Sequence, residues 1–233
     1  MAAPKDPGLL LGRNDEYRKA EIFLPFQALE PSNICIHEPY SFKTSHTTQG
    51  SQCGNNQSNQ SNQTEQTKTI ALLSYKTSVF TLPSLNILTQ FCRVFAWDSA
   101  TGRLDLEIDP TSTTASKCLA LQDFITTTLK AKPSWLPVGQ RRPEDISANF
   151  QKLLYNGILT VYLHGANPEK KVMGRAWQYN KGIWERGVGP GSFKKGQQIR
   201  VALRFQGLCF ITLVNGVVRY RLQHQTVCIY HKE

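Results

Sequence analysis

The chain has 233 residues, of which 40% are hydrophobic and 19% are charged, and its formal net charge at pH 7 is +10. A chain of this length can bury a sizeable core, and this composition excludes a fibrous or an intrinsically disordered protein. No stretch reaches the about 18 consecutive apolar residues that a membrane-spanning helix needs, and the run of three Leu near the start is too short for a signal peptide. We therefore predict a soluble protein of the cytoplasm or nucleus, or one that is exported without a signal peptide.

The positive charge is concentrated in the C-terminal half. Residues 1–116 contain 9 Lys and Arg against 11 Asp and Glu, a net of −2, whereas residues 117–233 contain 18 against 6, a net of +12. Such a field favours anionic partners, among them nucleic acid and sulfated glycans. The alternative is a solvated basic surface that binds no partner.

In chain order, the first apolar segments suit extended structure better than helix. Residues 21–42 contain two short apolar runs that are interrupted by prolines, which is typical of edge strands. Residues 44–68 are rich in Asn, Gln, Ser and Thr and contain no large apolar side chain, so we predict a flexible insert there.

The next segments predict further strands and one helix. Residues 69–82 and 92–109 have the composition of strands, and the second segment is expected to turn at Ser99–Gly102. Only residues 119–131 have a helical spacing of apolar side chains. The N-terminal half is therefore predicted to be mostly β.

The C-terminal part, residues 140–233, is predicted to form a compact antiparallel β module. Asn156-Gly157 and Asn215-Gly216 fall between apolar runs, and Asn-Gly is the strongest short signal for a hairpin. We predict a three-stranded meander at the C-terminal end, in which the strand at 198–205 is joined to the next strand through Gln206-Gly207. Apolar side chains alternate with Arg200 and Arg204 in that first strand, so one of its faces should be buried and the other basic and solvated.

No pattern of an enzyme or of a metal site occurs in the sequence. The chain lacks the nucleophile-elbow, zinc-protease, phosphate-loop and dinucleotide-binding motifs. Its six Cys are widely spaced, without a CxxC pair and without a His at metal-ligand spacing, which predicts free thiols. We therefore predict a non-enzymatic protein without catalytic residues, cofactor or metal.

From residue 163 onward, the order of the motifs resembles the carbohydrate-recognition domain of galectins. The motifs are Leu163-His164 with Asn167-Pro168, then Trp184 with Glu185-Arg186, then a turn at Phe193–Gln197, and a last strand at Phe210–Gly216. The resemblance implies an all-β fold, with a galectin-like antiparallel β-sandwich, or jelly roll, in residues 116–233. Residues 1–115 would be a β-rich region of unknown type around the insert at 44–68. This region would be either a second β domain or a set of strands that complete the C-terminal sheet.

The resemblance also implies a sugar site. A neutral sugar offers hydroxyl groups and one apolar face, so its site needs polar side chains and a flat aromatic ring. The candidate binding residues are His164, Asn167, Arg175, Trp184, Glu185 and Arg186. Trp184 would stack on a galactose ring, although a hydrophobic plug is the plainer interpretation of this side chain.

Galactose-containing glycans or a glycoprotein are the partners that the resemblance implies, and a symmetric homodimer is the implied assembly. Glu169 stands where the family has an Arg that donates to the sugar. This reversal of charge leaves open a diverged galectin fold that binds protein.

A competing hypothesis is a nucleic-acid-binding or viral accessory protein. It depends on the basic C-terminal half and on aromatic residues interleaved with cations between positions 175 and 186. The aromatic residues are Trp177, Tyr179 and Trp184, and the cations are Arg175, Lys181 and Arg186.

Overall fold

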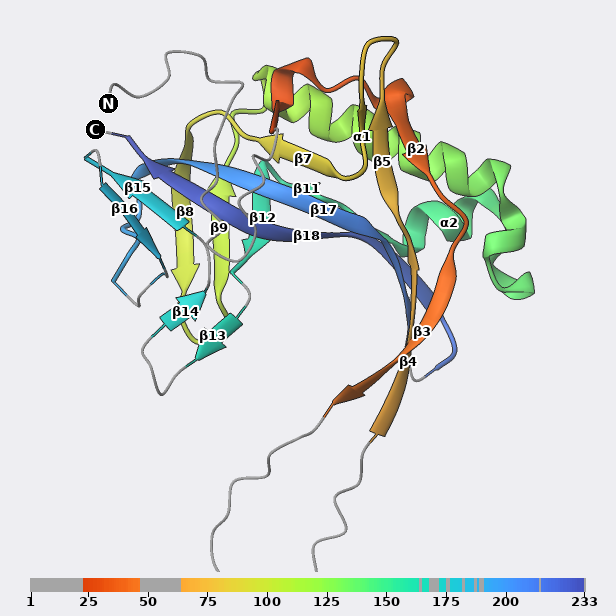
Figure 1. Cartoon of the computed structure of the whole chain (residues 1–233). Coiled ribbons are helices and arrows are strands. Elements are labelled where there is room, and N and C mark those ends of the chain that lie inside the picture. The colour runs from red at the N-terminus through yellow and green to blue at the C-terminus, as the bar shows by residue number, and fades with distance from the viewer. Residues whose placement is uncertain are drawn as a thin grey trace, which may run out of the picture.

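The computed structural model describes residues 23–46, 64–163, 165–167, 172–174, 177–181, 183–186, 188, 191–213 and 215–232. Most of these residues form β-strands, and the helices α1 (Thr113–Ala131) and α2 (Pro143–Asn149) lie together at one end of the sheet (Figure 1). Short 3-10 turns are η1 (Phe26–Ala28), η2 (Pro31–Asn33), η3 (Pro133–Trp135) and η4 (Val138–Gln140). The strands before the helices are β1 (Leu24–Pro25), β2 (Ile34–Ile36), β3 (Tyr40–His46), β4 (Thr64–Ala71), β5 (Leu73–Lys76), β6 (Thr81–Leu82), β7 (Leu85–Leu88), β8 (Cys92–Asp98) and β9 (Arg103–Glu107). The strands after the helices are β10 (Phe150–Gln151), β11 (Leu154–Tyr155), β12 (Ile158–Tyr162), β13 (Gly165–Asn167), β14 (Val172–Gly174), β15 (Trp177–Asn180), β16 (Ile183–Arg186), β17 (Gln198–Thr212) and β18 (Val218–His231).

The main sheet is organised around the long strand β17. Along one edge β17 pairs with β18 over nearly its whole length, and along the other edge it pairs in turn with β8, β7 and β4. The order continues from β8 through β9 and β12 to β11, and from β18 through β15 to β16. In the described residues, β13 with β14 and β2 with β5 and β6 form two smaller sheets.

The hairpin of β17 and β18 differs from the predicted meander. The turn at Asn215-Gly216 is confirmed, because Leu213 donates from its amide to the carbonyl oxygen of Val217 and Gly216 has a φ of 79°. The predicted turn at Gln206-Gly207 is wrong, because β17 runs through this point with a β-bulge. A Cβ atom on Gly207 would meet the carbonyl oxygen of Ala71 at 2.5 Å, so the glycine allows β4 to approach closely.

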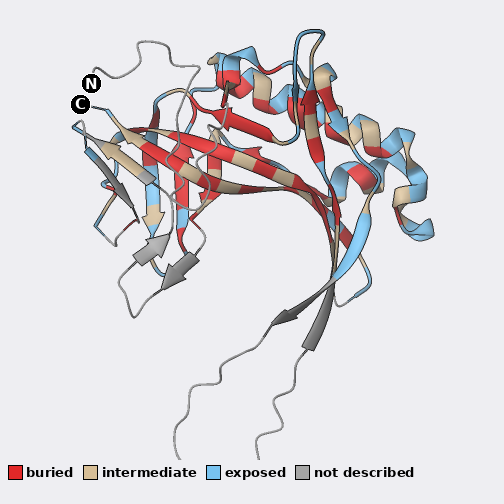
Figure 2. Ribbon diagram, in the orientation of Figure 1, coloured by how far each residue is buried: buried red, intermediate tan, exposed pale blue. Residues whose placement is uncertain are grey.

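Alternation along β17 is confirmed and defines two sides of the sheet. Ile199, Val201, Leu203 and Phe205 are buried, whereas Arg200 and Arg204 are only partly buried. The second side is not solvated throughout, because Ala202 between the two arginines is fully buried in a small cluster with Phe23, Leu88 and Cys228. We call the side of Ile199 the inner side of the sheet and the side of Arg200 the outer side. Figure 2 shows this alternation as buried and intermediate stripes along β17 and β18.

Helix α1 covers the inner side and completes the core. The hydroxyl of Ser112 caps its first turn by accepting from the amide of Ala115. Leu121, Ile125 and Leu129 are fully buried in one cluster with the inner side chains of the sheet. The helix predicted at 119–131 is confirmed and begins six residues earlier, at Thr113.

The hairpin at Asn156-Gly157, the helix α2 and the ends of the insert predicted at 44–68 are three further local features. Asn156 and Gly157 both have positive φ, at 50° and 74°, and join β11 to β12 in the predicted hairpin. Helix α2 was not predicted, although Pro143 at its first turn and the acidic Glu144 and Asp145 behind it are ordinary signals of a helix start. Strands β3 and β4 pair from Tyr40↔Ile70 to His46↔Thr64, so the ends of the insert predicted at 44–68 are strands, and residues 47–63 lie outside the described residues.

The two halves of the chain share one sheet and one core. The boundary predicted at 115/116 falls inside α1. Strand β9 pairs with β12, and β4, β7 and β8 pair with β17, so strands from residues 64–107 complete the sheet of the C-terminal half. The buried cluster likewise extends from Phe26 to Ile229.

The described cysteines and helices can be compared with the predictions of free thiols and of a chain without a membrane-spanning helix. Cys35, Cys92, Cys118, Cys209 and Cys228 are free thiols, as their spacing predicts, and Cys53 lies outside the described residues. Within the described ranges, no helix combines the length and the apolar character that crossing a membrane requires.

The close approach at Gly207 predicts a large effect of a single methyl group. Gly207→Ala should lower the free energy of unfolding by about 1–3 kcal/mol, because either β4 or β17 must move to accommodate the new Cβ atom. Gly139→Ala is the matched control, since a Cβ atom there would meet no atom within 4 Å. Denaturant unfolding of both variants measures the difference, and equal stabilities would contradict the packing described for Gly207.

Candidate functional site

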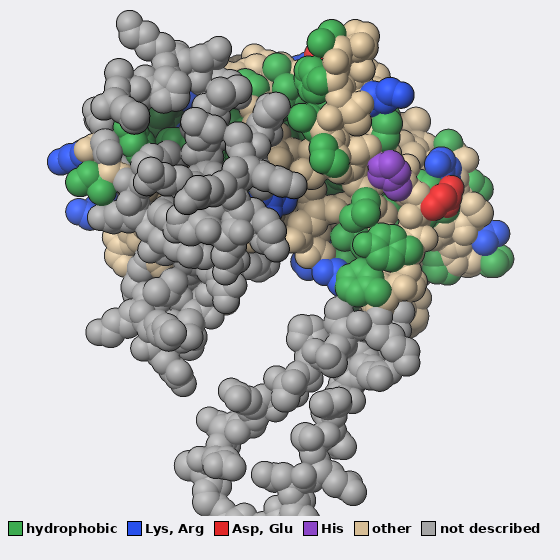
Figure 3. All heavy atoms as spheres, in the orientation of Figure 1, with side chains coloured by type: hydrophobic (Ala, Val, Ile, Leu, Met, Phe, Trp, Pro, Cys, Tyr) green, Lys and Arg blue, Asp and Glu red, His purple; other side chains and the backbone are tan. Residues whose placement is uncertain are grey.

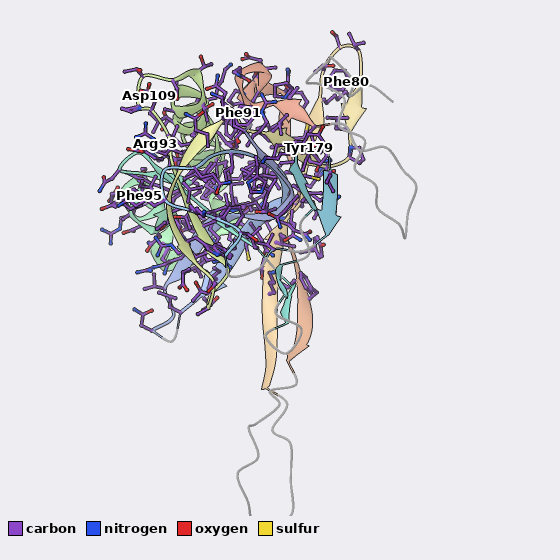
Figure 4. The ribbon with its side chains drawn as sticks, turned by 90° about the vertical axis from the view of Figure 1, so that its left-hand side faces the viewer. Phe80, Phe91, Arg93, Phe95, Asp109 and Tyr179 are labelled. Atoms are coloured by element: carbon purple, nitrogen blue, oxygen red, sulfur yellow. The ribbon has the colours of Figure 1, made fainter. Side chains whose placement is uncertain are left out.

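The outer side of the sheet carries exposed aromatic rings on both sides of an arginine. In β8, Cys92 and Val94 point into the core, whereas Arg93 and Phe95, together with Phe91 just before the strand, are exposed. Phe91 and Phe95 are 42% and 46% exposed, which is unusual for rings that could enter a core. Figure 4 shows the three side chains along the same side of the molecule.

A β-bulge keeps the aromatic rings on the outer side. The register between β8 and β9 shifts between Val94 and Ala96, so that Phe95 and Ala96 are both exposed. Beyond the bulge, the ring of Trp97 contacts that of Phe193 edge to face, with centroids 5.1 Å apart, and packs against the core. The bulge therefore returns Trp97 to the inner side without burying Phe95.

Cations lie over the two exposed rings. The Arg200 guanidinium carbon is 5.2 Å from the centre of the Phe91 ring, and the Lys232 ammonium is 5.9 Å from it. The Lys195 ammonium is 5.5 Å from the centre of the Phe95 ring. We call the surface formed by Phe91, Arg93, Phe95, Lys195, Arg200 and Lys232 the aromatic–basic face. Phe91, Arg93 and Phe95 are labelled at the left of Figure 4, and this side of the molecule faces away from the viewer in Figure 3.

The electrostatics of this face are dominated by positive charge. Arg93 pairs with Glu107 at 3.6 Å, but both side chains are about half exposed, so water screens this pair. Partial burial lowers the pKa of Arg200, yet an arginine stays protonated at any physiological pH. Burial raises the pKa of Cys92, which lies beneath the face, to about 11, so this thiol contributes no negative charge near neutral pH.

Further aromatic rings extend the face across the sheet. Arg200 is opposite Tyr230 in the register of β17 and β18, and Tyr230 is opposite Tyr179 in the register of β15 and β18. The two tyrosine rings lie 6.0 Å apart. Burial raises the pKa of Tyr230, so its phenol remains neutral beside Arg200. Tyr179, which the nucleic-acid hypothesis singled out, therefore lies next to the aromatic–basic face.

The predicted sugar-site residues are placed only in part. Asn167 ends β13, in a sheet that pairs with β14, whereas Trp184, Glu185 and Arg186 belong to β16, which pairs with β15. His164 and Arg175 lie outside the described residues. The described backbone thus puts Asn167 and the Trp184–Arg186 segment into separate sheets.

Residues of the aromatic–basic face were not predicted as a site. The alternation from Phe91 to Phe95 is visible in the sequence, and Arg93 shares a side with the two rings. However, a strand pattern does not show which side is buried, and phenylalanine at alternate positions ordinarily indicates the core. The arginine between the two rings is the one local signal that this side is solvated.

Comparisons of the chain with protein-family models, with curated proteins and with solved structures find no match. In the part of the chain that the structure describes, no three His, Cys, Asp or Glu side chains gather as a metal site would require. The chemistry of the aromatic–basic face is therefore the main guide to function.

Because the rings of Phe91 and Phe95 are exposed, they should contribute little to the free energy of unfolding. The double variant Phe91→Ser/Phe95→Ser should retain its free energy of unfolding to within about 0.5 kcal/mol per site. Phe205→Ala, which removes a ring that is only 1% exposed, should lose about 3–5 kcal/mol. Thermal and denaturant unfolding compare the variants, and a loss in the double variant as large as that of Phe205→Ala would show that the rings belong to the core.

Proposed function

We propose that the protein is a non-enzymatic nucleic-acid-binding protein and that its aromatic–basic face binds single-stranded RNA or DNA. The observation that carries the proposal is the pair of exposed rings, Phe91 and Phe95, with cations over both and Arg93 between them. Unpaired bases stack on aromatic rings, and Lys and Arg neutralise the phosphates that join them.

The shape of the surface favours a single strand over a duplex. Phe91 and Phe95 are four residues apart along an extended segment, which is roughly 13 Å. Two such rings on a sheet offer flat stacking surfaces, which base-paired nucleotides inside a duplex cannot reach. Tyr179 and Tyr230 lie on the continuation of this surface, where both rings are partly buried.

Stacking predicts a specific loss of affinity in ring variants. Phe91→Ala and Phe95→Ala should each weaken binding of a single-stranded oligonucleotide by about 1–3 kcal/mol, measured by fluorescence anisotropy. Phe80→Ala is the matched control, because Phe80 is exposed to a similar degree, 43%, but lies at the opposite edge of the molecule in Figure 4. Equal effects of the three substitutions would rule out a role of the face in binding.

Neutralisation of phosphates predicts a further, separable effect on salt dependence. Removing a cation by Arg93→Gln or Lys195→Gln should flatten the slope of log affinity against log salt concentration by about 0.7 for each phosphate that the variant no longer neutralises. The ring variants should leave that slope unchanged. If the affinity of the wild-type protein does not depend on salt, the proposal is wrong.

Galectin-type sugar binding is the second candidate function, within a galectin-like jelly roll. It is supported by the order of motifs from Leu163 to Gly216 and by the position of Trp184, Glu185 and Arg186 together on β16. The proposed site would join these residues to His164, Asn167 and Arg175 and would take a galactose-containing glycan or a glycoprotein.

Lactose distinguishes the two candidates. The lectin hypothesis predicts glycan-array binding that lactose competes away, that is insensitive to salt and that Trp184→Ala abolishes while the variant remains folded. Wild-type protein without any lactose-sensitive signal would eliminate the lectin and leave the nucleic-acid proposal intact.

A further inference from the structure

A cavity of about 900 Å3 opens where the main sheet fails to close. β18 pairs with β10 at Tyr220 and Arg221 and with β15 at Cys228 to Tyr230, and between these points its edge pairs with no described strand. β12 lies close to this free edge, since the hydroxyl of Thr226 donates to the carbonyl oxygen of Tyr162 at 3.2 Å. The cavity occupies the remaining gap between β9, β12 and β18, with β10 and the end of α2 at one side.

Positive charge lines this cavity. Arg103 on β9, Lys152 after β10 and Arg221 on β18 come from three separate segments of the chain, and none of the described residues that line the cavity is Asp or Glu. Three cations around one volume repel each other, so an anion in the cavity would be favoured by all three.

Arg103 is oriented by a carboxylate behind it. Its Nε donates to Asp105 at 3.0 Å, and the hydroxyl of Thr160, which also lines the cavity, donates to the same carboxylate oxygen at 2.7 Å. Asp105 is 7% exposed and raises the pKa of Arg103. The bond uses only Nε, and the terminal amino groups of Arg103 form no hydrogen bond to another described side chain.

Arg221 and Gln223 have buried polar atoms that the fold does not satisfy. Nε of Arg221 and Oε1 of Gln223 are both inaccessible to water and have no hydrogen-bond partner among the described residues. The amide nitrogen of Gln223 donates to Gln206 at 2.6 Å, which fixes the oxygen as an acceptor. Leaving such groups unpaired costs stability, and because neither atom is accessible, a ligand in the cavity would pair with them only if the two side chains moved.

We infer that this cavity binds a phosphorylated sugar, either a sugar phosphate or a mononucleotide. Arg103, Lys152 and Arg221 would hold the phosphate by charge-assisted hydrogen bonds, and Gln151, which also lines the cavity, would bond to a sugar hydroxyl. The volume suits a ligand of this size, since small-molecule sites typically measure about 300–1,000 Å3. Tyr155, which is 65% exposed at the cavity, offers a ring on which a base could stack.

The inference does not rest on the proposed function, because the cavity and the aromatic–basic face share no residue. Phe91→Ala should therefore leave binding in the cavity unchanged. Arg221→Gln should conversely leave the stacking contribution of Phe91 and Phe95 to oligonucleotide binding unchanged.

Isothermal titration calorimetry with ribose 5-phosphate, adenosine 5′-monophosphate and ribose tests the inference on the full chain. Both phosphorylated ligands should bind, ribose should not, and tighter binding of the nucleotide than of ribose 5-phosphate would identify a mononucleotide as the ligand. Arg221→Gln should weaken the binding of ribose 5-phosphate at least about tenfold. Arg219→Gln is the matched control, because Arg219 is exposed on the same strand but does not line the cavity.

Lys152→Gln keeps the test decisive if Arg221→Gln fails to fold, since Lys152 is exposed and its loss should not affect folding. It should weaken the binding of ribose 5-phosphate severalfold at an unchanged melting temperature. Equal binding of ribose and ribose 5-phosphate, absence of binding by both phosphorylated ligands, or equal affinities of Arg219→Gln and Lys152→Gln would overturn the inference.

Discussion

The hydrogen-bonded ladder along β17 is the constraint on which the rest of the structure depends. One strand of 15 residues pairs with β18 on one edge and with β8, β7 and β4 on the other. This ladder ties strands from both halves of the chain into one sheet, and it fixes which side chains face α1. The aromatic–basic face follows from it, because the pairing of Cys92 with Ile199 puts both residues on the inner side and leaves Arg93 and Arg200 on the outer side.

Features set by short stretches of sequence could be predicted, and features set by distant contacts could not. Both Asn-Gly turns were predicted, since Asn-Gly is a local turn signal and both glycines, Gly157 and Gly216, adopt positive φ. The bulge at Gly207 was not predicted, because a glycine is needed there only to make room for the backbone of Ala71 on β4, which is distant in sequence. A glycine between two apolar runs has the same appearance whether it turns a chain or lets another strand approach.

The same distinction applies to the sites. The net positive charge of the C-terminal half was evident, but two cations of the aromatic–basic face, Lys195 and Lys232, come from a turn and from the residue after β18. The cavity could not be predicted at all, because Arg103, Lys152 and Arg221 meet only when the sheet brings β9, β10 and β18 together. The galectin resemblance uses one continuous stretch of chain, and its residues remain a prediction.

Register places the aromatic–basic face and the cavity on the same outer side of one sheet. Arg93 is opposite Glu107 in β9, and Arg103 on the same strand lines the cavity. The inner side, by contrast, is occupied by the core and by α1. The inner side therefore supplies most of the core, whereas both proposed binding sites lie on the outer side, which also carries a small buried cluster of Phe23, Leu88, Ala202 and Cys228.

Photocrosslinking of a single-stranded oligonucleotide that contains 4-thiouridine, mapped by mass spectrometry, tests the central claim most directly. The account predicts crosslinks at Phe91 and Phe95, which disappear when unlabelled oligonucleotide competes. Crosslinks confined to β3 and β4, or none at saturating oligonucleotide, would contradict it.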